Sequence, residues 1–122
     1  MSRRLFILGS TGSIGCSAIE VVQHLRQVAG KGSWPVVGLA AGENTTLLEE
    51  QAELINCEAI SAKVSYASKA KHVYCGKNSA VEMICNHAKR GDLVVAAIVG
   101  FSGIAPVLAA IDCGCDIALA NK

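Results

Sequence analysis

The chain of 122 residues alternates between two hydrophobic patterns from one end to the other. Short apolar runs, typical of buried strands, occur at 5–8, 36–41, 59–60, 72–75, 92–99 and 116–120. Between them apolar side chains recur three and four positions apart, which indicates helices over 13–28, 44–55, 79–88 and 104–111. A further polar helical piece is predicted between the strands at 59–60 and 72–75.

The same spacing predicts which side chains each helix turns inward. These are Ile14, Ala18, Ile19, Val22 and Leu25 in the first helix, Leu47, Leu48, Ala52 and Ile55 in the second, and Val81, Ile84, Cys85 and Ala88 in the third. Strands that alternate with helices favour the α/β class, here one Rossmann-like, doubly wound parallel sheet with right-handed crossovers and helices on both faces. No linker or repeat divides residues 1–122, so we expect a single domain.

A glycine-rich turn joins the first strand to the first helix. It reads Gly9-Ser10-Thr11-Gly12-Ser13-Ile14-Gly15, a GxxGxxG spacing. We expect Gly9 to allow the tight exit from the strand, Gly12 to let a ligand approach the backbone, and Gly15 to let the helix pack close to the sheet. The helix would then offer free N–H groups to a diphosphate. The alternative is that these small residues only pack a helix on a sheet.

The strand exits single out further candidates, because ligands of such sheets bind beyond the carboxyl ends of the strands. The exits are 9–14, 42–44, 97–100 and 121–122, and they should share one edge.

Composition narrows the classes of partner. Eleven basic and ten acidic residues leave a net charge of +1, without a basic stripe that carries interleaved aromatics, so nucleic acid is not expected. No apolar run reaches the roughly 18 residues that a membrane span requires. The apolar segment after Arg3 and Arg4 ends after four residues in the glycine turn, too short for a secretion signal, which favours a cytoplasmic protein.

The remaining reactive side chains form no metal or disulfide pattern. We expect the six cysteines to be buried thiols that act as small hydrophobes, and His24, His72 and His87 to be surface or packing residues. Glu49, Glu50 and Glu53 should form the solvated face of their helix, and neither they nor Asp112 and Asp116 are expected to bind metal.

Four motifs together resemble one known family. GSTGSIG at 9–15, AGEN at 41–44, AAIVG at 96–100 and ALANK at 118–122 are similar in order and spacing to the N-terminal nucleotide-binding domain of the 1-deoxy-D-xylulose 5-phosphate reductoisomerases. The resemblance covers essentially the whole chain. It implies an NADPH-dependent enzyme of non-mevalonate isoprenoid biosynthesis that rearranges and reduces 1-deoxy-D-xylulose 5-phosphate to 2-C-methyl-D-erythritol 4-phosphate. It also implies a homodimer and a Mg²⁺ or Mn²⁺ ion bound by a catalytic domain outside this chain.

The resemblance also implies roles for individual residues. Thr11, Gly12, Ser13 and Ile14, with Gly9 and Gly15 shaping the turn, would hold the NADPH diphosphate and neighbouring ribose. Gly42, Glu43 and Asn44 would line the adenosine end, and residues 97–100 would form a wall beside the cofactor. Asn121 would contact the nicotinamide half, and Lys122 would reach the substrate. No residue of this chain is expected to be catalytic.

Two features depart from the family pattern. Position 43 is often basic or neutral in the family, whereas a carboxylate at the end of a second strand suits the ribose 2′-hydroxyl of NADH and repels a 2′-phosphate. We retain NADPH on the family's account, with Asn44 and other groups as candidates for binding the phosphate. The chain also stops at Lys122, directly after a strand at the expected ligand edge, so we expect a fragment that is inactive by itself.

Two other functions remain open. One is a free-standing dinucleotide-binding or sensor module, and the other is a different NAD(P)-dependent dehydrogenase that shares the GxxGxxG turn. An exposed apolar face would speak against an independent module.

Overall fold

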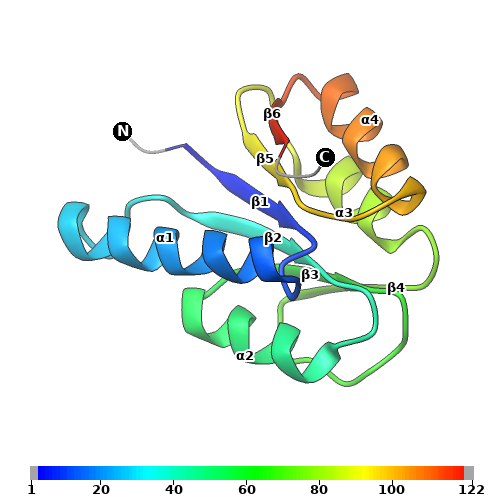
Figure 1. Ribbon diagram of the computed structural model, residues 1–122, viewed down its shortest axis with the longest axis horizontal. Coiled ribbons are helices and arrows are strands. Elements are labelled where there is room, and N and C mark those ends of the chain that lie inside the picture. The colour runs from blue at the N-terminus through cyan, green and yellow to red at the C-terminus, as the bar shows by residue number, and fades with distance from the viewer. Residues whose placement is uncertain (1–2, 120–122) are drawn as a thin grey trace.

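A six-stranded, fully parallel sheet forms the centre of the computed structural model, which describes residues 3–119 (Figure 1). Its strands are β1 Leu5–Leu8, β2 Val36–Ala40, β3 Ala59–Ala62, β4 His72–Cys75, β5 Leu93–Ala96 and β6 Asp116–Leu119. They are arranged in the order β4-β3-β2-β1-β5-β6. The chain therefore builds outward from β1 to β4 and then crosses back to the other side of β1. The predicted parallel α/β sheet is confirmed.

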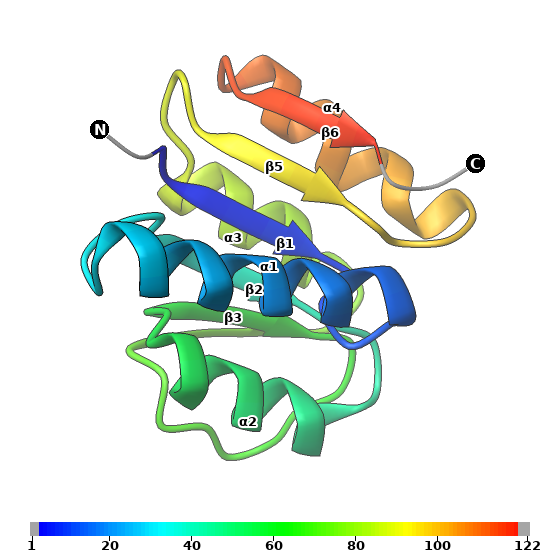
Figure 2. The same ribbon diagram turned by 60° about the vertical axis from the view of Figure 1, so that its left-hand side comes forward.

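Helices cover both faces of the sheet (Figure 2). The helices are α1 Ser13–Ala29, α2 Thr45–Ile55, α3 Ser79–His87 and α4 Ile104–Asp112, the last preceded by a short 3₁₀ turn, Phe101–Gly103. Helices α1 and α2 pack on one face, and α3 and α4 pack on the other. None of the helices within residues 3–119 is long and apolar enough to cross a membrane.

The alternation of side chains along β1 divides the core into two layers. Leu5 and Ile7 join the cluster beneath α1 and α2, whereas Phe6 and Leu8 join the cluster beneath α3 and α4. All four side chains are buried, as expected for a central parallel strand that is covered on both faces.

The prediction of a helical segment between β3 and β4 is wrong. Residues 63–71 form an irregular segment, which the Glu49 carboxylate of α2 holds in place. That carboxylate accepts hydrogen bonds from the Tyr66 hydroxyl at 3.1 Å, the Ser68 hydroxyl at 2.6 Å and the backbone N–H of Lys69 at 2.9 Å. Glu49 is therefore a structural anchor, and the expectation that it merely forms part of a solvated face is also wrong.

Some predicted inward positions also differ. Helix α3 buries Met83 with Ile84, and this orientation leaves Cys85 exposed to solvent. Ile14 is 45 % exposed because it lies in the first turn of α1, at the rim of the sheet rather than over it.

Candidate functional site

The loop between β1 and α1 is fixed by close backbone packing. The N–H groups of Gly9 and Ser10 both donate to the carbonyl oxygen of Ala40, at 2.8 and 3.0 Å. Gly9 has φ +81°, and a Cβ there would lie 2.7 Å from the carbonyl carbon of Ala97. A Cβ on Gly15 would overlap the carbonyl oxygen of Gly9. Both glycines are therefore needed by the fold itself, at the tight exit and at the close helix contact.

The middle glycine of the loop faces open space. A Cβ on Gly12 would meet only the carbonyl oxygen of Gly9 within 4 Å, at an ordinary contact distance of 3.6 Å. Gly12, Ser13 and Ile14 are exposed, and no side chain caps the start of α1. The first N–H groups of a helix have no intrahelical acceptor, so the start of α1 offers them to an incoming anion.

Gln51 of α2 supports this loop from beneath, a contribution that the sequence analysis missed. Its side chain is 4 % exposed, and its Nε2 donates to the carbonyl oxygen of Ser10 at 2.8 Å. The sequence did hold a clue to this role, because Gln51 is a polar side chain on the apolar face of α2, between Leu48 and Ile55. Gln51 therefore links α2 to the loop through a buried hydrogen bond.

A cavity of about 540 Å³ opens at the carboxyl edge of the sheet, beside this loop. It is lined by Gly9, Gly12, Ala40, Ala41, Gly42, Lys63, Lys77, Asn78, Ser79, Ala80, Val81, Ala97, Ile98, Val99, Phe101, Ser102, Ala105 and Pro106. The structure thus brings together three of the four strand exits that we expected to share one edge. The fourth exit, with Asn121 and Lys122, lies outside the described residues.

The other predicted site residues lie beside this cavity rather than in its lining. Thr11, Ser13 and Ile14 form the outer part of the loop and the start of α1. Asn44 is the N-cap of α2, where its Oδ1 accepts a hydrogen bond from the N–H of Leu47 at 3.2 Å. Glu43 is exposed to solvent next to Gly42.

The model of the 1-deoxy-D-xylulose 5-phosphate reductoisomerase family matches residues 5–122. The chain belongs to this family. It is 39 % identical over 127 residues to the reductoisomerase of Geotalea uraniireducens (strain Rf4), with 98 % of this chain and 32 % of that protein covered. It is 38 % identical over 130 residues to that of Rhizobium meliloti (strain 1021), with 100 % of this chain and 32 % of the relative covered.

Solved reductoisomerase structures share this fold. The Zymomonas mobilis enzyme, in complex with NADPH, superposes with a TM-score of 0.82 at 27 % identity, covering 99 % of this chain and 32 % of that one. A reductoisomerase in complex with NADPH, fosmidomycin and magnesium gives a TM-score of 0.78 at 26 % identity, covering 98 % and 30 %. The chain therefore spans about a third of the length of the relatives that it matches.

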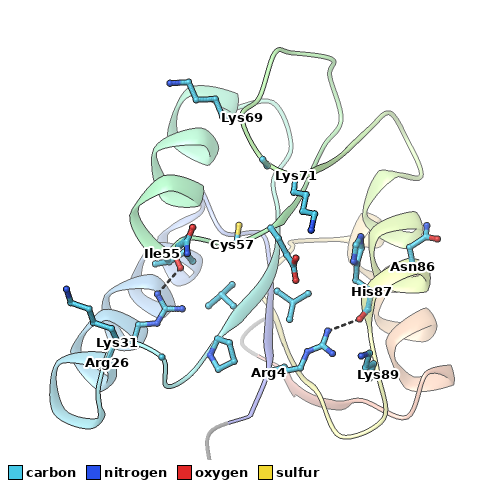
Figure 3. Close-up of a pocket in the computed structure, with 17 residues that line it drawn as sticks. Arg4, Arg26, Lys31, Ile55, Cys57, Lys69, Lys71, Asn86, His87 and Lys89 are labelled. Atoms are coloured by element: carbon cyan, nitrogen blue, oxygen red, sulfur yellow. Dashed lines mark hydrogen bonds between the residues drawn. The ribbon is translucent and has the colours of Figure 1, made fainter.

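A second and larger hollow, of about 900 Å³, lies at the opposite, amino edge of this reductoisomerase sheet (Figure 3). Its two arginines serve the fold. Arg26 donates to the carbonyl oxygens of Ser33, Trp34 and Ile55, at 2.8 to 3.2 Å, and so joins α1 to the end of α2. Arg4 donates to the carbonyl oxygen of His87 at 2.9 Å. Because ligands of parallel sheets bind at the carboxyl edge, the smaller cavity beside the glycine loop is the better candidate for a cofactor site.

The cysteines are only partly the buried thiols that we expected. Cys57 and Cys115 are buried, whereas Cys16, Cys75 and Cys113 are half-buried and Cys85 is exposed. Burial raises the pKa of Cys57 to about 12, so this thiol is inert at neutral pH.

Two of the histidines are neighbours in space. The rings of His72 and His87 lie 4.6 Å apart, and Nε2 of His87 is 2.8 Å from the Tyr74 hydroxyl. Burial, followed by the charge of His72, lowers the pKa of His87. Both are packing residues of β4 and α3, far along the chain from the glycine loop, which agrees with their predicted role.

Proposed function

We propose that this chain binds NADPH at the carboxyl edge of its sheet, as the cofactor-binding part of a 1-deoxy-D-xylulose 5-phosphate reductoisomerase. The observation that carries the proposal is the open, uncapped start of α1 beside Gly12, at the mouth of the 540 Å³ cavity. Membership of the reductoisomerase family supports it. So does the Zymomonas mobilis relative, whose solved structure is a complex with NADPH.

The residue assignments follow the chain's own geometry and the family pattern. Thr11, Gly12, Ser13 and Ile14 bind the diphosphate and the neighbouring ribose through backbone N–H groups and hydroxyls. Gly9 and Gly15 shape the turn, and Gly42, Glu43 and Asn44 lie at the adenosine end. Residues 97–100 form an apolar wall. For two residues outside the described part of the chain the family pattern alone is the support: Asn121 contacts the nicotinamide half, and Lys122 reaches the substrate.

When bound, NADPH supplies the hydride that reduces the rearranged aldehyde in this family's reaction. The chain's own contribution is to hold and orient the dinucleotide. No group of three His, Cys, Asp or Glu side chains within residues 3–119 is placed to hold a metal ion, so this part of the chain does not fit the Mg²⁺ or Mn²⁺ of the family. We expect this chain by itself to bind nucleotide without turning over substrate.

The wider context is also a proposal. The longer protein acts on 1-deoxy-D-xylulose 5-phosphate as a homodimer in the cytoplasm, without a nucleic-acid or membrane partner. Support comes from the family and from a net charge of only +1. The exposed apolar side chains of α4 favour a part of a larger protein over a free-standing sensor module.

Calorimetric titration of the 122-residue chain with NADPH tests the proposal. We expect saturable binding with a stoichiometry of one, and weaker binding by Gly12→Val, whose side chain fills the approach to the N–H groups. Val28→Lys, an exposed position at the opposite end of α1 from Gly12, should bind as the wild type does. A wild-type chain that binds no NADPH, or a Gly12→Val variant that binds it equally well, would contradict the proposal.

A further inference from the structure

The exit of β2 presents an electrostatic problem for NADPH. Glu43 follows directly after Gly42, where Rossmann-like folds contact the ribose 2′ position. Its carboxylate is exposed and makes no hydrogen bond or ion pair with another residue in the range 3–119. A carboxylate would repel a 2′-phosphate, so the positive charge that NADPH requires must come from another element.

The neighbouring strand supplies a lysine at the same level. Strand β3 pairs with β2, and Lys63 follows the last residue of β3. The backbone N–H of Lys63 donates to the carbonyl oxygen of Gly42 at 2.9 Å, which fixes this lysine beside the β2 exit. Lys63 also lines the cavity that Gly12 and Gly42 line.

The next strand supplies a second lysine. Lys77 lies two residues beyond the end of β4, immediately before Asn78, the N-cap of α3. Lys77 and Asn78 line the same cavity. The start of α3, with the positive end of its dipole, lies there as well, and the Asn78 side chain does not cap it.

The charges of both lysines remain available. Lys63 and Lys77 are exposed, and neither forms an ion pair within the described part of the chain. Two ammonium groups on flexible stems therefore flank the adenosine end of the cavity, against the single carboxylate of Glu43. Lysine ammonium groups bind phosphate as compact point charges with three donors each.

We infer that Lys63 and Lys77 bind the 2′-phosphate of NADPH and set the preference for NADPH over NADH, in place of a basic residue at position 43. The inference rests on the proposed function, since it needs a dinucleotide in this cavity. It assigns the recognition of the phosphate to the exits of β3 and β4. Glu43 then faces solvent, on the outer side of Gly42.

The test compares NADPH and NADH affinities by calorimetric titration of the 122-residue chain and its variants. We expect the wild type to prefer NADPH, and Lys63→Gln/Lys77→Gln to lose about tenfold or more in NADPH affinity, as expected when two charge-assisted contacts are removed. NADH affinity should change less than about twofold, because NADH lacks the phosphate. Lys63→Arg/Lys77→Arg should keep the preference, and Lys69→Gln/Lys89→Gln, at the amino edge of the sheet, should behave as the wild type.

Two further measurements sharpen the result. The probe 2′,5′-ADP should bind the wild type more tightly than AMP does, and this difference should vanish in Lys63→Gln/Lys77→Gln. The NADPH preference should also shrink as salt rises, because exposed charges are screened over about 10 Å at 0.1 M.

The outcomes separate the two proposals. A wild type that binds neither dinucleotide overturns the proposed function and this inference with it. A wild type that binds both equally, or that prefers NADH, overturns this inference alone. So does a glutamine double variant that keeps its NADPH preference while its circular dichroism spectrum shows a folded chain.

Discussion

At the residue scale, the three glycines of the β1–α1 loop are required for different reasons. Gly9 and Gly15 are required by the packing of the protein against itself, because a Cβ at either position meets backbone atoms at less than van der Waals distance. Gly12 has no such neighbour, so its lack of a side chain matters to whatever approaches the loop from outside. The first two glycines are structural, and the third belongs to the binding site.

This difference predicts opposite behaviour for two alanine substitutions. Gly15→Ala should lower the free energy of unfolding by about 3 kcal/mol or more, the upper end of overpacking costs, because the carbonyl oxygen of Gly9 cannot retreat. Gly12→Ala should leave stability within about 0.5 kcal/mol of the wild type and weaken NADPH binding. Urea denaturation and calorimetric titration measure the two effects. Equal stability of the two variants would contradict this division of roles.

At the element scale, the segment between β3 and β4 depends on one carboxylate. The pKa of Glu49 is lowered by hydrogen bonds, chiefly from the Ser68 hydroxyl and then from the N–H of Lys69. A carboxyl whose pKa is depressed in the folded state contributes stability above its ordinary pKa of 4.5 and loses it as the pH falls below that value. The fold of residues 63–71 should therefore loosen in acid.

Glu49→Gln is expected to remove that dependence. It should lower the free energy of unfolding at pH 7 by roughly 1 kcal/mol, less than for a buried charged hydrogen bond, because solvent screens the site. Urea midpoints between pH 3 and pH 7 should fall more steeply with acid in the wild type than in the variant. The matched control is Glu50→Gln, an exposed neighbour on α2, which should follow the wild-type curve. If the urea midpoints of Glu49→Gln and the wild type fell equally with acid, Glu49 would not be the residue that anchors this segment.

Two buried serines give a second test at the same scale. The Ser79 hydroxyl donates to the carbonyl oxygen of Ala62 at 3.0 Å and so joins the start of α3 to the end of β3. The Ser61 hydroxyl, equally buried in β3, has no hydrogen-bond partner in the described part of the chain. Ser79→Ala should lower the free energy of unfolding by about 1 kcal/mol, whereas Ser61→Ala should leave it unchanged or raise it. A thermal melt of each variant measures this, and equal losses would contradict it.

At the scale of the whole molecule, the apolar pattern predicted each α-helix and each strand within residues 3–119. The four central strands and the helices bury a continuous run or stripe, and the edge strands β4 and β6 are apolar although their side chains are only partly buried or exposed. The pattern failed over residues 63–71, whose conformation depends on Glu49, a residue of another element. It also missed Gln51, because its role appears only when α2 lies against the glycine loop. Likewise, Lys63 becomes a candidate only once β3 stands beside β2. The pattern of apolar residues in one segment predicts the helix or strand that the segment forms. A site built from the exits of several strands cannot be predicted in this way, because it depends on which strands lie side by side.

The molecule also carries an apolar surface that nothing in residues 3–119 covers. Ile104, Leu108 and Ile111 lie four and three positions apart on α4 and are 50, 56 and 53 % exposed. Phe101, in the turn before α4, is 89 % exposed. Phe101 also lines the cofactor cavity, whereas the three α4 side chains lie outside it. Exposed apolar side chains on one helix promote association, and their presence fits the proposal that more protein normally packs against α4.

We therefore expect the 122-residue chain to self-associate as its concentration rises. Leu108→Lys/Ile111→Lys should reduce this in sedimentation velocity while leaving the thermal midpoint within a few degrees, because both positions face solvent. Ala110→Lys, on the fully buried side of the same helix, should unfold the domain instead. If the double variant associates as strongly as the wild type, the exposed face of α4 is not the surface that drives association, and the case against a free-standing module loses its structural support.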